Sequence, residues 1–230
     1  VALLILRAAR RRAATGDSAV LRCSVPFARL RILSALACAG LVGCAAPGAP
    51  RTDVDALVHE ATIAELQAAL RDGSVRCAEL VDAYLARIEV YDDATGLGAI
   101  TEVNPRARER AAELDARLAA GEPPGPLFCA PLLVKDNFDT ATMPTTGGSV
   151  ALAGSVPPDD AFQVRRIREA GAIVLAKSNL AEFAFTAFET VGSMLPGWTF
   201  NPYALNRVTA GSSGGTAAAV AANLGLVGLG

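Results

Sequence analysis

Hydrophobic and polar positions follow two different periods along residues 57–230. Between positions 81 and 88, apolar residues recur at helical spacing and predict a helix with one buried face. Continuous apolar runs at 132–134 and 172–176 predict buried strands, and 99–101 predicts a short strand. The chain therefore alternates helices with strands.

Capping and turn residues set the expected bounds of the first two helices. Thr62 followed by Glu65 matches a capping box, and Gly73 is a typical helix end. Ser74 is the expected N-cap of the helix that carries the apolar face.

Two further helices are predicted from the same kinds of residue. Asn104-Pro105 predicts a cap and a first-turn proline, and Gly121 ends the charged, alanine-rich segment that follows. Asp159 or Asp160 is the expected cap of a helix that Gly171 ends.

The order of these elements predicts the architecture. Strand 132–134, a helix and strand 172–176 form a parallel pair joined by a right-handed crossover. An α/β fold, with helices covering both faces of the sheet, follows from this order. Residues 186–210 form a long irregular segment, a type of loop that is often functional.

Composition and charge narrow the class of partner. The chain has 230 residues, 52% of them hydrophobic, and a net charge of -2. Residues 1–52 hold eight arginines against Asp17, a balance of +7, which leaves -9 for the rest. An acidic body argues against a nucleic-acid partner.

The basic beginning of the chain has the pattern of an export signal. Arg29 and Arg31 accompany the apolar run 30–42, which is too short to span a bilayer. Leu41-Val-Gly-Cys44 resembles a bacterial lipobox, in which Cys44 would be the lipidated residue. Cleavage without a lipid, or a chance apolar segment, are the alternatives.

These observations divide the chain into four parts. Residues 1–28 are interpreted as an over-extended or disordered leader, 29–44 as a signal peptide and 45–56 as a linker. Residues 57–230 form the folded part. The expected location is the periplasm or the cell envelope of a bacterium, with membrane contact only through a lipid anchor.

Cysteine spacing gives no metal motif. Outside the leader only Cys77 and Cys129 remain, with no C-x-x-C pair. They either form a disulfide, as an exported protein permits, or Cys77 is buried and free on its helix.

The candidate chemistry comes from a lysine and a glycine-rich serine turn. Lys135 follows the apolar strand 132–134 directly, at the end where α/β proteins place ligands. Thr209-Ala-Gly-Ser-Ser-Gly-Gly-Thr216 leads into a helical stretch of small residues. A buried lysine has a lowered pKa and, when neutral, serves as a base that activates a serine.

Other interpretations of these residues stay open at this point. Lys135 could extend to solvent or pair with Asp136 or Asp139. The glycine-rich turn could be a linker or a phosphate cradle, but it lacks the lysine of a P-loop and the G-x-G-x-x-G spacing. The one histidine, His59, is distant in sequence from both segments.

Several segments together resemble the amino-terminal part of the amidase signature family, from about residue 57 to residue 230. The matching segments are Ala130–Asn137, Met143–Ser149, Asp160–Gly171, Lys177–Phe183, Asn201-Pro202 and Gly211–Gly215. The resemblance implies an α/β fold with a mixed, largely parallel central sheet flanked by helices, and hydrolysis of a linear carboxylic amide without a metal or cofactor.

The resemblance also implies roles for particular residues. The family uses a Ser–Ser–Lys triad, in which Lys135 matches the lysine and Ser212 matches the middle serine, held by a cis peptide after Gly211. Ser213, Gly214 and Gly215 would belong to the neighbourhood of the substrate and the oxyanion.

One departure from the family pattern concerns the nucleophile. The family's nucleophilic serine lies in a second motif, Thr-Asp-x-Gly-Gly-Ser, which would follow Leu226–Gly230. We therefore expect residues 1–230 to be an inactive fragment of an amidase whose substrate is a small-molecule or peptide amide.

Three alternatives remain. The chain could be the A subunit of a tRNA-dependent amidotransferase, a non-catalytic surface lipoprotein that binds amides or peptides, or a nucleotide-binding domain. Within 194–200, Trp198 and Phe200 either line an acyl pocket or belong to the core.

Overall fold

The computed structural model describes residues 52–185 and 195–230. The predicted leader, the signal peptide, Cys44 and residues 186–194 of the irregular segment lie outside the described residues. A short helix, α1 (Val54–Leu57), occupies the end of the segment that was predicted to be a linker. The Asp53 carboxylate caps this helix by accepting hydrogen bonds from the N–H groups of Asp55 and Ala56.

The centre of the fold is a mixed sheet, as predicted. Its strands are β1 (Ile100–Val103), β2 (Pro131–Lys135), β3 (Ile173–Ser178) and β4 (Val227–Leu229), in the order β1-β3-β2-β4. The pairs β2–β3 and β2–β4 are parallel, whereas β1 is antiparallel to β3. The apolar pattern does not predict β4, which is short and half exposed.

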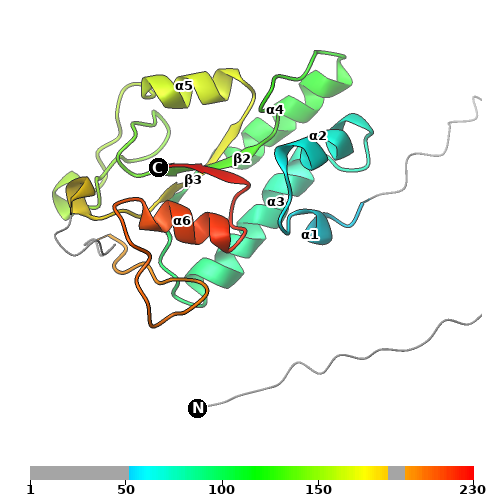
Figure 1. Cartoon of the computed structure of the whole chain (residues 1–230). Helices are drawn as coiled ribbons and strands as arrows, with labels where there is room; N and C mark the ends of the chain where they lie inside the picture. The colour runs from blue at the N-terminus through cyan, green and yellow to red at the C-terminus, as the bar shows by residue number, and fades with distance from the viewer. Residues whose placement is uncertain (1–51, 186–194) are drawn as a thin grey trace, which may run out of the picture. The chain divides into compact units, whose positions relative to one another are not determined.

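Helices cover both faces of this sheet (Figure 1). The further helices are α2 (Ile63–Arg71), α3 (Cys77–Ile88), α4 (Ala107–Ala119), α5 (Phe162–Glu169) and α6 (Gly214–Ala221), with short turns η1 (Glu89–Asp93), η2 (Val150–Leu152) and η3 (Glu182–Ala184). Helix α5 lies on one side of the sheet and α6 on the other (Figure 1).

Alternate residues of β2 belong to two separate hydrophobic clusters. Leu133 packs in the large cluster with residues of α3, α4 and α6. Leu132 and Val134 pack in a smaller cluster with Val164 of α5. This alternation follows from the strand geometry, in which successive side chains point to opposite faces.

The capping box of α2 is confirmed. The Thr62 N–H donates to the Glu65 carboxylate at 2.8 Å, and the Glu65 N–H donates to the Thr62 hydroxyl at 3.2 Å. These reciprocal bonds satisfy donors at the start of the helix that have no intrahelical partner.

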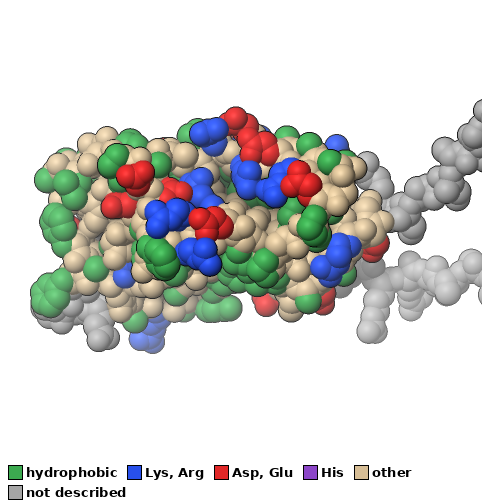
Figure 2. All heavy atoms as spheres, turned by 90° about the horizontal axis from the view of Figure 1, so that it is seen from above, with side chains coloured by type: hydrophobic (Ala, Val, Ile, Leu, Met, Phe, Trp, Pro, Cys, Tyr) green, Lys and Arg blue, Asp and Glu red, His purple; other side chains and the backbone are tan. Residues whose placement is uncertain are grey.

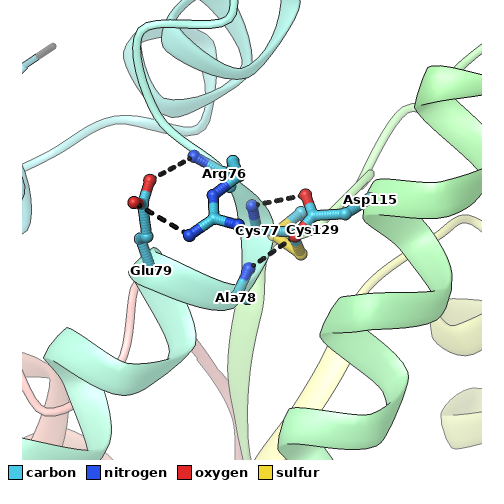
Figure 3. Close-up of a disulfide and its surroundings, with 6 residues drawn as sticks. All are labelled: Arg76, Cys77, Ala78, Glu79, Asp115 and Cys129. Carbon is cyan, nitrogen blue, oxygen red and sulfur yellow. Dashed lines mark hydrogen bonds and ion pairs between the residues drawn. A yellow bond between two sulfur atoms is a disulfide. The ribbon is translucent and has the colours of Figure 1, made fainter.

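The predicted cap of the next helix is wrong. Helix α3 begins after Arg76, and Asp115 of α4 takes the place of the expected Ser74. The Asp115 carboxylate accepts the N–H groups of Cys77 at 2.7 Å and Ala78 at 3.0 Å (Figure 3). A carboxylate that is 37 to 38 residues away in the chain thus accepts the first N–H groups of α3. The residues around Cys77 do not predict this contact.

The starts of α4 and α5 also differ from the predictions. Helix α4 begins at Ala107, later than the Asn104-Pro105 pattern predicts, and the Asn104 side chain accepts the Arg106 N–H in the turn before it. The Asp160 carboxylate accepts the N–H of Ala141 instead of capping α5. The Asn104 amide oxygen and the Asp160 carboxylate are therefore hydrogen-bonded to N–H groups outside these two helices.

Cys77 and Cys129 form a disulfide with a Cα–Cα distance of 5.7 Å (Figure 3). Of the two alternatives that the sequence leaves open, the structure therefore has the bonded form. The bond links the start of α3 to the segment directly before β2. It anchors the strand that ends at Lys135.

The surface seen from the side of α5 carries both signs of charge. Basic and acidic side chains are mixed on that face (Figure 2). Ion pairs among the described residues include Arg106–Glu109, Arg110–Glu113 and Arg166–Glu169. Within residues 52–185 and 195–230, no helix combines the length and the apolar content needed to cross a bilayer.

Reduction of the disulfide should destabilise the fold measurably. A bridge between residues 52 positions apart restricts the unfolded chain, so its loss should lower the free energy of unfolding by about 2–4 kcal/mol. Urea unfolding with and without dithiothreitol measures this difference. A Cys77→Ser/Cys129→Ser variant should match the reduced protein and should not respond to reductant; equal stability of both redox forms would contradict the prediction.

Candidate active site

Strand β2 places Lys135 at the carboxyl end of the parallel strands. All five residues of this strand are buried, and Lys135 itself is 5% exposed. Its amine lies 2.7 Å from the Ser212 hydroxyl and 2.8 Å from the Ser213 hydroxyl. The tertiary structure therefore brings together the lysine and the serine pair, which are 77 and 78 residues apart in the chain.

The serine turn has an unusual backbone. The peptide bond between Gly211 and Ser212 is cis, as the family resemblance implies, and Ala210 has a φ of 57°. Helix α6 begins directly after Ser213, with Gly214 and Gly215 in its first turn. The turn thus presents both hydroxyls to β2 from the start of α6.

Two backbone hydrogen bonds attach this turn to the segment after β3. The Ala181 N–H donates to the Ser212 carbonyl at 3.1 Å, and the Gly215 N–H donates to the Asn179 carbonyl at 3.2 Å. The Gly215 N–H is thus used to attach the turn to the fold, and the place of Gly215 in the neighbourhood of the substrate and the oxyanion stays a prediction. A Cβ atom on Gly215 would collide with the Asn179 backbone, which explains why glycine is required there.

A second pair of hydroxyls, which the sequence analysis does not single out, connects the end of β3 to the start of α6. Ser178 at the end of β3 and Thr216 of α6 are both buried, with their hydroxyl oxygens 2.6 Å apart. Each directly follows a residue that the sequence does single out, Lys177 and Gly215. Adjacency to those residues is the signal that would have identified them.

The environment of Lys135 lowers the pKa of its amine. Burial lowers the pKa of Lys135 below its usual range, and burial is the cause of the shift. Among the described residues, the carboxylate of Asp136 forms its ion pair with Lys177, at 3.1 Å, and not with Lys135. The interpretation of Lys135 as the partner of Asp136 is therefore wrong.

A shallow hollow of about 200 Å³ adjoins the serine turn. It is lined by Thr209, Ala210, Gly211, Ser213, Gly214 and Ala217. The predicted neighbours of the substrate thus share one surface, with Gly215 buried behind it. Space for a small group therefore exists next to Ser213.

Other candidates have a different role. His59 is exposed, and its ring contacts the Arg87 guanidinium of α3 at 2.8 Å. Trp198 and Phe200 are 60% and 40% exposed, so they do not belong to the core.

No group of His, Cys, Asp and Glu within the described ranges is arranged to hold a metal ion.

Comparison with known proteins identifies the family. The family model described as Amidase matches residues 79–230. The chain belongs to the amidase family. Solved amidase signature enzymes have the same fold as this part of the chain.

The curated relatives of this chain include components of an amidotransferase. In Halorhodospira halophila, the A subunit of glutamyl-tRNA(Gln) amidotransferase is 45% identical over 167 residues, which are 73% of this chain and 34% of the relative. The corresponding chloroplastic/mitochondrial protein of Zea mays is 43% identical over 79% of this chain and 33% of its own length. The chain spans about a third of the length of the curated relatives it matches.

The solved structures include enzymes named as amidases. The peptide amidase from Stenotrophomonas maltophilia is 44% identical, with a TM-score of 0.70 over 74% of this chain and 36% of that enzyme. An amidase family protein from Bacillus anthracis is 36% identical, with a TM-score of 0.72 over 76% of this chain and 36% of its own.

Substitution of Gly215 should loosen the serine turn. In a Gly215→Ala variant the added methyl group displaces α6 from Asn179, and overpacking of this kind lowers the free energy of unfolding by about 1–3 kcal/mol. Urea unfolding measures the change. An Ala217→Ser variant, which adds one atom at an exposed position of the same helix, should change stability by no more than about 0.5 kcal/mol; equal effects of the two variants would refute the explanation.

Proposed function

We propose that this chain supplies the lysine and the middle serine of a Ser–Ser–Lys relay that hydrolyses a linear carboxylic amide. The observation that carries the proposal is the 2.7 Å contact between the Lys135 amine and the Ser212 hydroxyl. A buried lysine that contacts hydroxyls, and whose neighbouring carboxylate is paired elsewhere, is suited to accept a proton.

In the proposed mechanism, neutral Lys135 is the base and Ser212 is the relay. Lys135 takes a proton through the Ser212 hydroxyl from a nucleophilic serine, and that serine attacks the amide carbonyl. Backbone N–H groups stabilise the oxyanion, and the amine leaves after receiving the proton. Water then hydrolyses the acyl-enzyme and regenerates the serine.

In this proposal the nucleophilic serine comes from a second glycine-rich motif. By resemblance it belongs to the Thr-Asp-x-Gly-Gly-Ser motif, which does not occur in the sequence. Gly230, directly after β4, lies against Ser213, and a Cβ atom there would approach the Ser213 Cβ at 2.9 Å. Strand β4 therefore runs toward the lysine–serine cluster, which supports the motif's place beside it.

The proposed substrate is a small-molecule or peptide amide. The likeness to a peptide amidase supports this class, and so does the mixture of charges on the face seen in Figure 2, which forms no basic stripe for a nucleic acid. The mechanism proposed for Lys135 and Ser212 calls for no cofactor.

The A subunit of an amidotransferase is the second candidate function. The names of the curated relatives favour it. Such a protein would act as one subunit of an enzyme that amidates glutamyl-tRNA, so hydrolysis of peptide amides in the absence of partner subunits distinguishes the two functions. A non-catalytic lipoprotein would bind amides but would hydrolyse none, with or without partner proteins.

We propose further that the protein is exported to the periplasm or cell envelope and anchored through Cys44. The lipobox-like Leu41–Cys44 segment suggests the anchor. The Cys77–Cys129 disulfide supports an oxidising compartment, since such bonds are rare in the cytosol. Export also argues against charged tRNA as a substrate.

Replacement of Lys135 tests the relay. In a longer form of the protein that carries the second glycine-rich motif, Lys135→Ala should reduce amide turnover at least about a hundredfold. Residues 1–230 by themselves should show no turnover of the same peptide amide. Because the protonated amine cannot accept a proton, turnover should fall as the pH drops through the lowered pKa of Lys135. Turnover near the wild-type rate in the variant would remove Lys135 from the mechanism.

Replacement of Cys44 tests the anchor. When the protein is expressed in a bacterium with radiolabelled palmitate, the wild type should carry label and fractionate with membranes, whereas Cys44→Ser should carry none. Cys23→Ser serves as the control, because it removes a cysteine outside the lipobox-like segment and leaves the Cys77–Cys129 disulfide in place. An unlabelled wild-type protein would refute lipidation.

A further inference from the structure

The second lysine, Lys177, forms a buried ion pair with the residue that follows Lys135. Lys177 is 0% and Asp136 1% exposed, and the amine lies 3.1 Å from the carboxylate. The same amine donates to the carbonyls of Phe138 at 2.8 Å and Pro144 at 3.2 Å, and to the Thr145 hydroxyl at 2.9 Å. All four acceptors belong to residues 136–145, which directly follow β2.

Asp136 is the point at which this loop closes on itself. Its carboxylate also accepts the N–H of Thr146 at 3.2 Å and the hydroxyl of the same residue. Its carbonyl accepts the Gly147 N–H at 2.9 Å. The chain that leaves β2 is therefore wrapped around the Lys177 amine and fixed at both ends.

The two lysines point to opposite faces of the sheet. In the register of β2 and β3, Lys177 pairs with Val134, whereas Lys135 pairs with Ser178. Successive side chains of a strand alternate between faces. Lys177 thus shares the α5 face with Val134, and Lys135 shares the α6 face with Leu133.

The two amines have different kinds of partner, although burial lowers the pKa of both lysines. Four acceptors surround the Lys177 amine, more than the two N–H donors of a neutral amine can serve, so the ammonium form fits there. Lys135 contacts two hydroxyls, which can donate as well as accept. A neutral amine is satisfied there without any carboxylate.

We propose that Lys177 is a positioning residue for Lys135: it holds the Asp136 carboxylate and the loop 136–146 on the α5 face, away from the Lys135 amine. A carboxylate within reach of Lys135 would favour its ammonium form and remove the base. The consequence for catalysis rests on the proposed function, but the effect on the protonation of Lys135 does not. Asp136 and Asp139 raise the pKa of Lys177 against the stronger lowering by burial, whereas burial alone accounts for the lowered pKa of Lys135.

The composition of the chain makes the proposal directly measurable. Lys135 and Lys177 are its two lysines, so protein labelled with ¹³C,¹⁵N-lysine gives two side-chain signals, which a Lys135→Met variant assigns. Titration of the Lys135 signal in the 230-residue chain should show a pKa below that of free lysine. In Lys177→Met, the released Asp136 carboxylate should raise the pKa of Lys135 by at least about one unit, a tenfold change in proton affinity.

Two further variants separate charge from packing. The double variant Lys177→Met/Asp136→Asn should return the pKa of Lys135 to its wild-type value, because no carboxylate remains to be released. Val164→Ala, which removes packing on the same face without touching a charge, should leave that pKa unchanged. A folded Lys177→Met protein with the wild-type pKa at Lys135 would overturn the proposal.

Asp136→Asn alone keeps the inference testable if Lys177→Met does not fold. Because the carboxylate is already held away from Lys135, its removal should change the pKa of Lys135 by less than about 0.5 unit. A decrease of more than one unit would show that the carboxylate acts on Lys135 in the wild type and would overturn the proposal. If these pKa values behave as expected but the longer form hydrolyses no amide, the positioning role stands and the proposed function fails.

Discussion

The candidate site depends on a buried amine that meets two hydroxyls instead of a carboxylate. Lys135 has lost most of its contact with water, and its partners are Ser212 and Ser213. Burial without a counter-ion disfavours the charged form of a lysine. The chemistry proposed for this site therefore requires that the surrounding structure keep acidic groups away from the Lys135 amine.

The sheet topology satisfies this requirement by separating two lysines. Neighbouring strands end at the same edge, but consecutive residues along them face opposite layers. Asp136 and Lys177 neutralise each other beneath α5, while Lys135 turns toward α6. A single sheet edge thus holds one lysine that is paired with a carboxylate and one lysine that contacts two hydroxyls.

The junction between β3 and α6 completes the arrangement. Backbone atoms of Asn179 contact Gly215 so closely that no side chain fits, and Ser178 shares a hydrogen bond with Thr216. These contacts set the start of α6 beside the end of β2. Membership of the amidase family, together with the position of Gly230 against Ser213, agrees with a site that lies where these segments converge.

The sequence by itself determined the alternation of helices and strands and the parallel β2–β3 pair, and it singled out Lys135 and the serine turn as candidates. These follow from hydrophobic periods, glycine positions and local motifs, which act over a few residues. Only the tertiary structure decided that Asp115 starts α3, that Cys77 bonds to Cys129 and that Asp136 pairs with Lys177. Each of these contacts joins groups from separate segments of the chain. The partner of a polar side chain depends on which segments pack together, and no local sequence pattern encodes that packing.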